Sequence, residues 1–277
     1  MNSDGPYEPP EGALNSLNPG PLSLVLNRRG STVWEVKTEL GPYAVKVGYA
    51  SRTHAWTALA PAREAAILRQ LSRERILSGE WERGTWSAQP WRKGDSLYEL
   101  WEPHRFENAS TAPDVGEALS CAVALAALHE KGWVHGDVQP AHFILGRTAE
   151  SFLIDLALAR GGAVPRGYDF PYRGCLVHYE APEISASVLE SGTATPTREA
   201  DVYALGASLF ISATGWRHVD YPDDASREDQ RRAIVAGPHR PVDVPGVLGS
   251  LIPHMLSRSP TDRPSSAEVC ETLSAAL

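Results

Sequence analysis

Two short apolar segments, each with an aspartate close by, constrain this chain more than any other feature. Residues 135–155 contain the runs H-G-D-V-Q-P-A-H-F-I-L and F-L-I-D. Their apolar ends predict two strands, Phe143–Leu145 and Phe152–Ile154, joined by a polar turn. Asp137 precedes the first strand and Asp155 follows the second. Such a hairpin can hold one carboxylate to accept a proton from a hydroxyl and one to bind a metal, as phosphoryl transfer from a nucleotide requires.

A lysine and a glutamate upstream form a second predicted pair. The alternating run Tyr43–Val47 predicts a strand that carries Lys46, and residues 63–71 predict a helix that carries Glu64. Apolar residues stand three, four and seven positions after Glu64, so its carboxylate shares the core-facing stripe of that helix. A buried glutamate is costly unless it is paired, and Lys46 is the obvious partner.

Together these motifs resemble those of the protein-kinase-like superfamily. The lysine run is close to the V-A-I-K of that family, and three further landmarks follow: Y-E-A-P-E at 179–183, D-V-Y-A-L-G at 201–206 and D-R-P at 262–264. These look like the end of the activation segment, the start of the central C-lobe helix, and the arginine that pairs with the A-P-E glutamate. The landmarks cover about residues 20–275 in the order of the family.

The resemblance implies an α+β, bilobal fold with a small β-rich N-lobe and a larger α-helical C-lobe. We expect a mobile tail at 1–19, where prolines are frequent, the N-lobe at 20–101 and the C-lobe at 102–277. The hinge between the lobes is expected within 98–103.

Local patterns add further elements. A first hairpin is predicted from Leu22–Leu26 and Thr32–Lys37. Helices are predicted at 114–131, where Gly132 would end the helix, and at 200–214, which is apolar around most of its circumference.

The resemblance also implies roles for individual residues. Asp137 would be the catalytic base, and Asp155 would bind Mg²⁺. Lys46 would contact the α- and β-phosphates of ATP, with Glu64 as its partner. Two further implied roles are structural: Glu183 and Arg263 would form an ion pair, and His135 would bond the backbone of the catalytic loop.

Several positions depart from the family pattern. His142 stands where the family has an asparagine that binds a second metal. A neutral imidazole is a poor Mg²⁺ ligand, so two alternatives stay open: one metal suffices, or His142 contacts the cofactor through a water. Gln139 stands where Ser/Thr kinases have a lysine. The D-F-G motif is Asp155-Leu156-Ala157, which stiffens the backbone. The arginine before the base is Gly136, so regulation by a phosphorylated activation loop is not expected.

The glycine-rich loop of the family is almost absent. Of its glycines, Gly30 remains, and Arg28, Arg29 and Ser31 are the candidates to contact the phosphates.

Composition excludes several other classes of protein. A net charge of −8 and a pI near 5.6 argue against a nucleic-acid binder. The three cysteines form no C-x-x-C pair and are expected to be reduced. No apolar run approaches the ~20 residues of a membrane helix, and the first residues lack the pattern of a signal peptide. We therefore expect a cytoplasmic protein without membrane association.

Three functions fit these observations. The first is an ATP- and Mg²⁺-dependent kinase that phosphorylates Ser/Thr hydroxyls of a peptide or protein. The second is a small-molecule phosphotransferase like the antibiotic kinases, and the third is a pseudokinase that only binds a partner. The A-P-E motif favours the first over the second, and the retained Lys46, Glu64, Asp137 and Asp155 favour it over the third. The loop at 135–142 also resembles kinase-like proteins of lanthipeptide pathways, which phosphorylate a precursor peptide before a separate lyase eliminates the phosphate.

Overall fold

The computed structural model describes residues 6–28, 30–51, 55–105, 112–146 and 151–277. The chain divides into two compact units, which are described separately. The first consists of the chain up to Arg92 together with Leu156–Leu158 and Gly162–Phe170. The second consists of Lys93–Asp155, Ala159–Gly161 and Pro171–Leu277.

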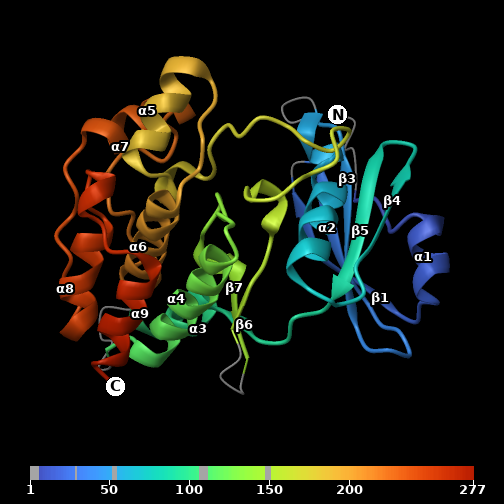
Figure 1. Ribbon diagram of the computed structural model, residues 1–277, viewed down its shortest axis with the longest axis horizontal. Coiled ribbons are helices and arrows are strands. Elements are labelled where there is room, and N and C mark those ends of the chain that lie inside the picture. Colours follow the sequence, from blue (N-terminus) through green and yellow to red (C-terminus); the bar gives the residue numbers. More distant parts are fainter. Residues whose placement is uncertain (1–5, 29, 52–54, 106–111, 147–150) are drawn as a thin grey trace. The chain divides into compact units, whose positions relative to one another are not determined.

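The first unit is built on an antiparallel sheet with strand order β1-β2-β3-β5-β4 (Figure 1). The described strands are β1 (Leu22–Arg28), β2 (Ser31–Val36), β3 (Tyr43–Tyr49), β4 (Leu77–Trp81) and β5 (Gly84–Pro90). The predicted first hairpin is confirmed as β1–β2, in which Arg28 lies opposite Ser31 at the turn. Gly30 in that turn has φ +87°, and a Cβ there would come within 2.6 Å of the Tyr49 carbonyl oxygen. A glycine is therefore required at this position.

Two helices cover opposite faces of this sheet (Figure 1). Helix α2 (Ala60–Leu71), predicted from the spacing of its apolar residues, lies on the face that carries Lys46. Helix α1 (Glu11–Leu17) packs on the other face. There Ala13 and Leu17 join Val45 and Trp86 in one apolar cluster.

Helix α1 does not fit the mobile tail expected at 1–19. Pro10 precedes the helix, and Ala13 and Leu17, which are four positions apart, are both buried against the sheet. The carbonyl oxygen of Tyr7 also accepts hydrogen bonds from Thr32 Oγ1 (2.7 Å) and Trp34 Nε1 (3.0 Å) on β2. Residues 7–17 are thus part of the first unit. The proline-rich composition of this stretch hid about two turns of helix with one apolar face.

The connection between the units also differs from the sequence expectation. Strand β5 ends at Pro90, and the chain enters the second unit at Lys93. The short strand β6 (Asp95–Ser96) already pairs within that unit, and residues 97–100 form helix α3 (Leu97–Leu100). Ser96 caps α3 by accepting a hydrogen bond from the Glu99 backbone N–H, which fixes the helix start. Residues 98–103 therefore belong to the second unit.

The second unit is mainly helical. Its longer helices are α4 (Val115–Glu130), α5 (Pro182–Ser191), α6 (Arg198–Thr214), α7 (Arg227–Ala236), α8 (Gly246–Met255) and α9 (Ser266–Ser274). Short 3₁₀ turns in the described chain are Ala55–Ala58, Glu102–Arg105, Pro140–His142, Leu156–Leu158, Val177–Tyr179 and Pro260–Asp262. The predicted helices at 114–131 and 200–214 are confirmed as α4 and α6. Residues 200–210 of α6 are all buried, so this helix forms the centre of the unit.

A small sheet of β6, β7 (Phe143–Leu145) and β8 (Ser151–Leu153) completes the second unit. Strands β7 and β8 are antiparallel, which confirms the predicted hairpin. The α+β class, with a β-rich N-lobe and a helical C-lobe, is confirmed. In the described part of the chain, none of the helices has the length and apolar character needed to cross a membrane.

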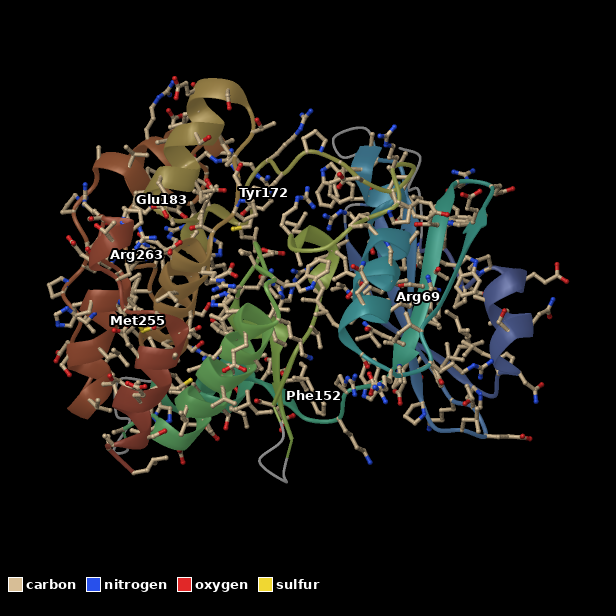
Figure 2. All side chains as sticks on the ribbon, in the orientation of Figure 1. Arg69, Phe152, Tyr172, Glu183, Met255 and Arg263 are labelled. Atoms are coloured by element: carbon tan, nitrogen blue, oxygen red, sulfur yellow. The ribbon has the colours of Figure 1, made fainter. Side chains whose placement is uncertain are left out.

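The predicted ion pair between α5 and the chain after α8 is present (Figure 2). The Arg263 guanidinium donates two hydrogen bonds, of 2.7 and 2.8 Å, to the two carboxylate oxygens of Glu183. It also donates to the backbone carbonyl of Glu199 at the start of α6. The pair therefore joins the A-P-E motif to the central helix.

Candidate active site

The first group of predicted site residues lies in the N-terminal unit. The Lys46 ammonium on β3 is 2.8 Å from Glu64 Oε2 and 2.9 Å from Glu64 Oε1 on α2. The Glu64 side chain is 1% exposed and that of Lys46 is 13% exposed. A buried carboxylate of this kind is stabilised by a nearby ammonium, as the sequence predicted. The pair fixes the lysine against the sheet.

The strand register places further side chains on the same face as Lys46. Val33 lies opposite Lys46, and Leu26 lies opposite Val33. Since directly opposite residues share one face of a sheet, these two aliphatic side chains lie on the lysine side. The alternation along the strands puts Arg28 and Ser31 on this face as well. Arg29, the third predicted phosphate contact, lies outside the described residues.

The buried Arg63 beside Glu64 was not recognised from the sequence. Its side chain is 1% exposed, and it donates to the Ala157 carbonyl (2.5 Å) and to Asp169 Oδ1 (3.3 Å). The guanidinium carbon also lies 5.2 Å from the centre of the Phe170 ring. Glu64 Oε1 accepts from the Leu156 backbone N–H (3.3 Å), so adjacent residues of α2 bind adjacent residues of the segment that follows Asp155.

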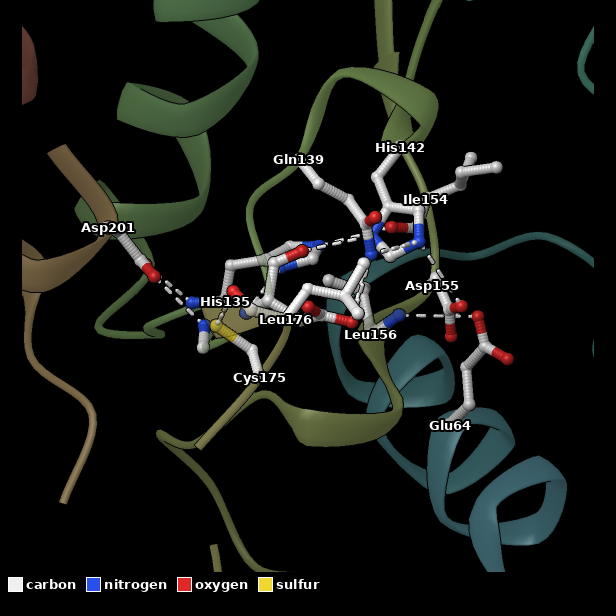
Figure 3. Close-up of polar contacts among 12 residues, drawn as sticks. Glu64, His135, Gln139, His142, Ile154, Asp155, Leu156, Cys175, Leu176 and Asp201 are labelled. Atoms are coloured by element: carbon white, nitrogen blue, oxygen red, sulfur yellow. Dashed lines mark hydrogen bonds and ion pairs between the residues drawn. The ribbon is translucent and has the colours of Figure 1, made fainter. Parts of the chain in front are cut away.

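The second group lies in the C-terminal unit and is anchored to α6 (Figure 3). Asp201 accepts hydrogen bonds from the backbone N–H groups of His135 (2.6 Å) and Gly136 (2.9 Å). His129 Nε2 is 3.0 Å from the same carboxylate, and Tyr172 donates to the Gly136 carbonyl (2.7 Å). Gly136 has φ +75°, a conformation that favours glycine. These contacts fix the backbone immediately before Asp137.

His135 ties this loop to the strand that precedes Asp155. Its Nδ1 accepts from the Asp137 backbone N–H, and its Nε2 donates to the Ile154 carbonyl (3.0 Å). These two bonds define a neutral ring, and burial lowers the pKa of His135 below its usual value. The expected structural role of His135 is confirmed.

The catalytic-loop side chains form a connected set (Figure 3). The Gln139 amide nitrogen is 3.3 Å from Asp137 Oδ2 and 3.1 Å from His142 Nε2. His142 Nδ1 is 2.9 Å from the Asp137 carbonyl oxygen, and His142 Nε2 is 3.4 Å from Asp155 Oδ2. Three of the predicted site residues, Asp137, His142 and Asp155, are thus brought together.

Asp155 adopts an unusual backbone conformation. Its φ of +64° lies in the left-handed region, which aspartate tolerates better than most residues. Such a conformation costs on the order of 1 kcal/mol and requires fixed neighbours. The Ile154 backbone N–H donates to the His142 carbonyl (2.9 Å), and the Leu156 N–H donates to Glu64.

A second buried ion pair in this unit was not predicted. Arg231 on α7 bonds both carboxylate oxygens of Glu180, at 2.7 and 3.1 Å. Ser185 and the Cys175 backbone N–H bond the same carboxylate. Gly174 is required here, because a Cβ would lie 2.0 Å from Glu180 Oε2. The sequence carries no spacing signal that links Glu180 to Arg231, which lie 51 positions apart.

All three cysteines are free thiols, as predicted. Cys175 follows Tyr172, which bonds the catalytic loop, by three residues, and burial raises the pKa of its thiol well above the usual value. The Asp137 charge raises it further. The thiol is therefore neutral and poorly reactive.

Comparison with known proteins places this site in a family. The protein kinase domain model matches residues 30–273. Serine/threonine-protein kinase PkaA of Streptomyces coelicolor is 31% identical over 181 residues, which cover 61% of this chain and 31% of that protein. Serine/threonine-protein kinase PknK of Mycobacterium tuberculosis is 32% identical over 163 residues, 56% of this chain and 14% of that protein.

A third relative extends the matched region. Serine/threonine-protein kinase PknJ of Mycobacterium tuberculosis is 28% identical over 237 residues, 78% of this chain and 37% of that protein. The chain thus corresponds to a minor part of each of these relatives. The family model covers both groups of site residues, from the strand of Lys46 to the loop of Asp137. The chain therefore belongs to the protein kinase domain family.

Proposed function

We propose that this chain is an ATP-dependent kinase that phosphorylates serine or threonine hydroxyls of a protein or peptide. The observation that carries the proposal is the joint presence of the Lys46–Glu64 ion pair and the Asp137–Asp155 hairpin in one protein kinase domain. The names of the relatives, all serine/threonine-protein kinases, support the class of acceptor.

Nucleotide binding would use the lysine face of the N-terminal sheet. Lys46, held by Glu64, carries the positive charge for the α- and β-phosphates. Leu26 and Val33 offer aliphatic surface for the base, and Arg28 and Ser31 lie on the same face near the turn. Arg29 stays a predicted phosphate contact. These donors and charges fit a nucleoside triphosphate.

The hairpin of the C-terminal unit would supply the metal and proton chemistry. The Asp155 carboxylate, 39% exposed, is a hard oxygen ligand of the kind that Mg²⁺ prefers. When bound, Mg²⁺ neutralises charge on the phosphates. Asp137, held by Gln139, orients the acceptor hydroxyl and takes its proton.

The scaffold supports a polypeptide acceptor over a small molecule. The Glu183–Arg263 pair holds the A-P-E segment onto α6, and Asp201 holds the catalytic loop onto the same helix. These features belong to the frame on which protein kinases bind an extended substrate. Small-molecule phosphotransfer and partner binding without catalysis are the alternatives that an assay must separate from this proposal.

A narrower proposal concerns the substrate. The H-G-D-V-Q-P-A-H loop resembles that of lanthipeptide-pathway kinases, and we propose a ribosomal precursor peptide whose phosphate a separate lyase eliminates. Gln139 replaces the lysine that would help orient the phosphate, so local selectivity is expected to be weak. Affinity would then come from a leader segment bound away from the reacting hydroxyl.

Calorimetric titration with ATP, with and without Mg²⁺, tests the kinase proposal. We expect ATP binding that requires Lys46 and is tightened by Mg²⁺. Lys46→Met should weaken this binding, and Lys131→Met, at the exposed end of α4, should not. Absence of binding at millimolar ATP with Mg²⁺ present would exclude the kinase function.

The acceptor is tested separately by transfer assays. The substrates are a Ser/Thr-rich precursor peptide with its leader, the same peptide without it, and small hydroxylated compounds. Faster transfer to the leader-bearing peptide supports the narrower proposal. Equal rates with and without the leader would exclude recognition through the leader. Transfer only to small compounds would favour the phosphotransferase alternative.

A further inference from the structure

The imidazole of His142 is held in one tautomer. Its Nδ1 lies 2.9 Å from the backbone carbonyl oxygen of Asp137. A carbonyl oxygen only accepts hydrogen bonds, so Nδ1 carries the proton and donates it.

The other ring nitrogen faces a donor. The side-chain nitrogen of Gln139 is 3.1 Å from His142 Nε2. An amide nitrogen carries hydrogens and has no acceptor lone pair, so Nε2 must be the acceptor in this contact. Both contacts therefore assign the same neutral ring, protonated at Nδ1 and carrying a lone pair on Nε2.

That lone pair lies beside a carboxylate, and a cation that binds it replaces the Gln139 amide as its partner, leaving Gln139 bonded to Asp137. His142 Nε2 is 3.4 Å from Asp155 Oδ2, and the His142 side chain is only 12% exposed. Two ligand atoms about 2.1 Å from one metal ion lie roughly 3–3.5 Å apart, so this separation suits two atoms that share a cation. The protonated Nδ1 anchors the ring from behind, as ligating histidines commonly require.

We infer that His142 Nε2 and Asp155 form one side of a divalent-cation site that favours a transition-metal ion such as Mn²⁺ over Mg²⁺. Mg²⁺ prefers oxygen ligands, whereas a transition ion accepts both the imidazole nitrogen and the carboxylate. The inference rests on the proposed function, because nucleotide phosphates and water would complete the coordination. In the described residues, no group of three or more His, Cys, Asp or Glu side chains could hold a metal without such help.

The first test compares metals in binding, without turnover. A non-hydrolysable ATP analogue is titrated into the wild-type chain with saturating Mg²⁺ and with saturating Mn²⁺. We expect wild type to bind the analogue about tenfold more tightly with Mn²⁺ than with Mg²⁺. In His142→Asn this ratio of the two affinities should fall to about twofold or less. Asparagine still donates to the Asp137 carbonyl and supplies an oxygen ligand. His254→Asn, a change at an exposed histidine of α8, should behave as wild type.

The second test detects the bond itself. Electron spin-echo modulation of the Mn²⁺–nucleotide complex should show ¹⁴N coupling from a directly bound imidazole in wild type and in His254→Asn, but not in His142→Asn. Because this signal is measured on wild type, the test does not depend on how well His142→Asn folds. Absence of ¹⁴N coupling in wild type, or the same Mn²⁺ to Mg²⁺ ratio with and without His142, overturns the inference while nucleotide binding persists. Failure to bind nucleotide with either metal instead overturns the proposed function and this inference with it.

Discussion

At the scale of single residues, the position of Asp137 is set by its neighbours rather than by its own side chain. The backbone before it is fixed by Asp201 and Tyr172, and its own N–H donates to His135. Gln139 bonds one carboxylate oxygen. An amide of the same shape should occupy the same place, because its oxygen still accepts from Gln139.

Asp137→Asn is therefore expected to lose transfer while keeping nucleotide affinity. Loss of the proton acceptor should lower kcat by about 10²–10⁴-fold, whereas Kd for ATP should change only a few fold. Steady-state kinetics with an unphosphorylated acceptor peptide measure kcat, and calorimetry measures Kd. Asp114→Asn is the control, since asparagine caps α4 as well as aspartate does. Near-normal turnover in Asp137→Asn would contradict the assignment of the base.

At the scale of elements, α2 does more than carry the partner of Lys46. Arg63 and Glu64 bind the backbone of residues 156–157, and Gln70 near the end of α2 donates to the Ala163 carbonyl (2.8 Å). On β4, Glu80 accepts from the Tyr168 hydroxyl (3.1 Å). These hydrogen bonds hold residues 156–158 and 162–170 within the first unit.

Replacement of Arg63 should loosen this segment. Arg63→Met removes the bonds to Ala157 and Asp169, at a cost of about 1–3 kcal/mol because the Ala157 carbonyl loses its donor. Limited proteolysis should show faster cleavage within 159–168, with partial recovery in Arg63→Lys. Arg75→Met, shortly after the same helix, removes a hydrogen bond to the Ser16 carbonyl and should leave that cleavage unchanged. If Arg63→Met and wild type are cleaved at equal rates, Arg63 does not hold the segment.

Elements with a strong local pattern could be predicted, and contacts between distant residues could not. The β1–β2 and β7–β8 hairpins, α2 and α6 follow from apolar spacing and turn residues. The Lys46–Glu64 pair followed because a carboxylate on an apolar stripe demands a cation. The contact of Arg63 with Ala157 spans 94 residues and leaves no periodic trace, so it was missed. The Gln139–His142 contact depends on side-chain orientation, which composition and spacing do not specify.

At the scale of the whole molecule, buried histidines should make stability depend on pH. Burial lowers the pKa of His218 to about 3 and that of His178 to about 4, and the charges of His239 and Arg217 add to these respective shifts. The unfolded chain binds these protons near pH 6.5, whereas the folded chain does not. The free energy of unfolding therefore keeps its full value above about pH 6.5. It decreases as the pH falls from 6.5 towards the pKa values of the folded state.

The contribution of His218 can be isolated. Each pH unit below 6.5 should cost about 1.4 kcal/mol through this buried group. His218→Gln keeps an acceptor for the Tyr203 hydroxyl, which lies 2.6 Å from His218 Nε2, but removes the titration. Thermal unfolding between pH 7 and 5 should show a smaller decrease in Tm for His218→Gln than for wild type, with His254→Gln as the exposed control. Parallel curves for all three proteins would contradict the prediction.

The chain changes unit at five points, after Arg92, Asp155, Leu158, Gly161 and Phe170. The first unit is consequently not one continuous stretch of sequence, and a single crossover between two genes cannot exchange it. Consider a chimera that takes residues 1–92 from this chain and the remainder from a relative. In it, Arg63 would face the relative's segment in place of 156–170, and its buried guanidinium would be paired only if that segment carries a carboxylate at the position of Asp169. An exchange of the first unit therefore has to carry both residues 1–92 and the stretch at 156–170.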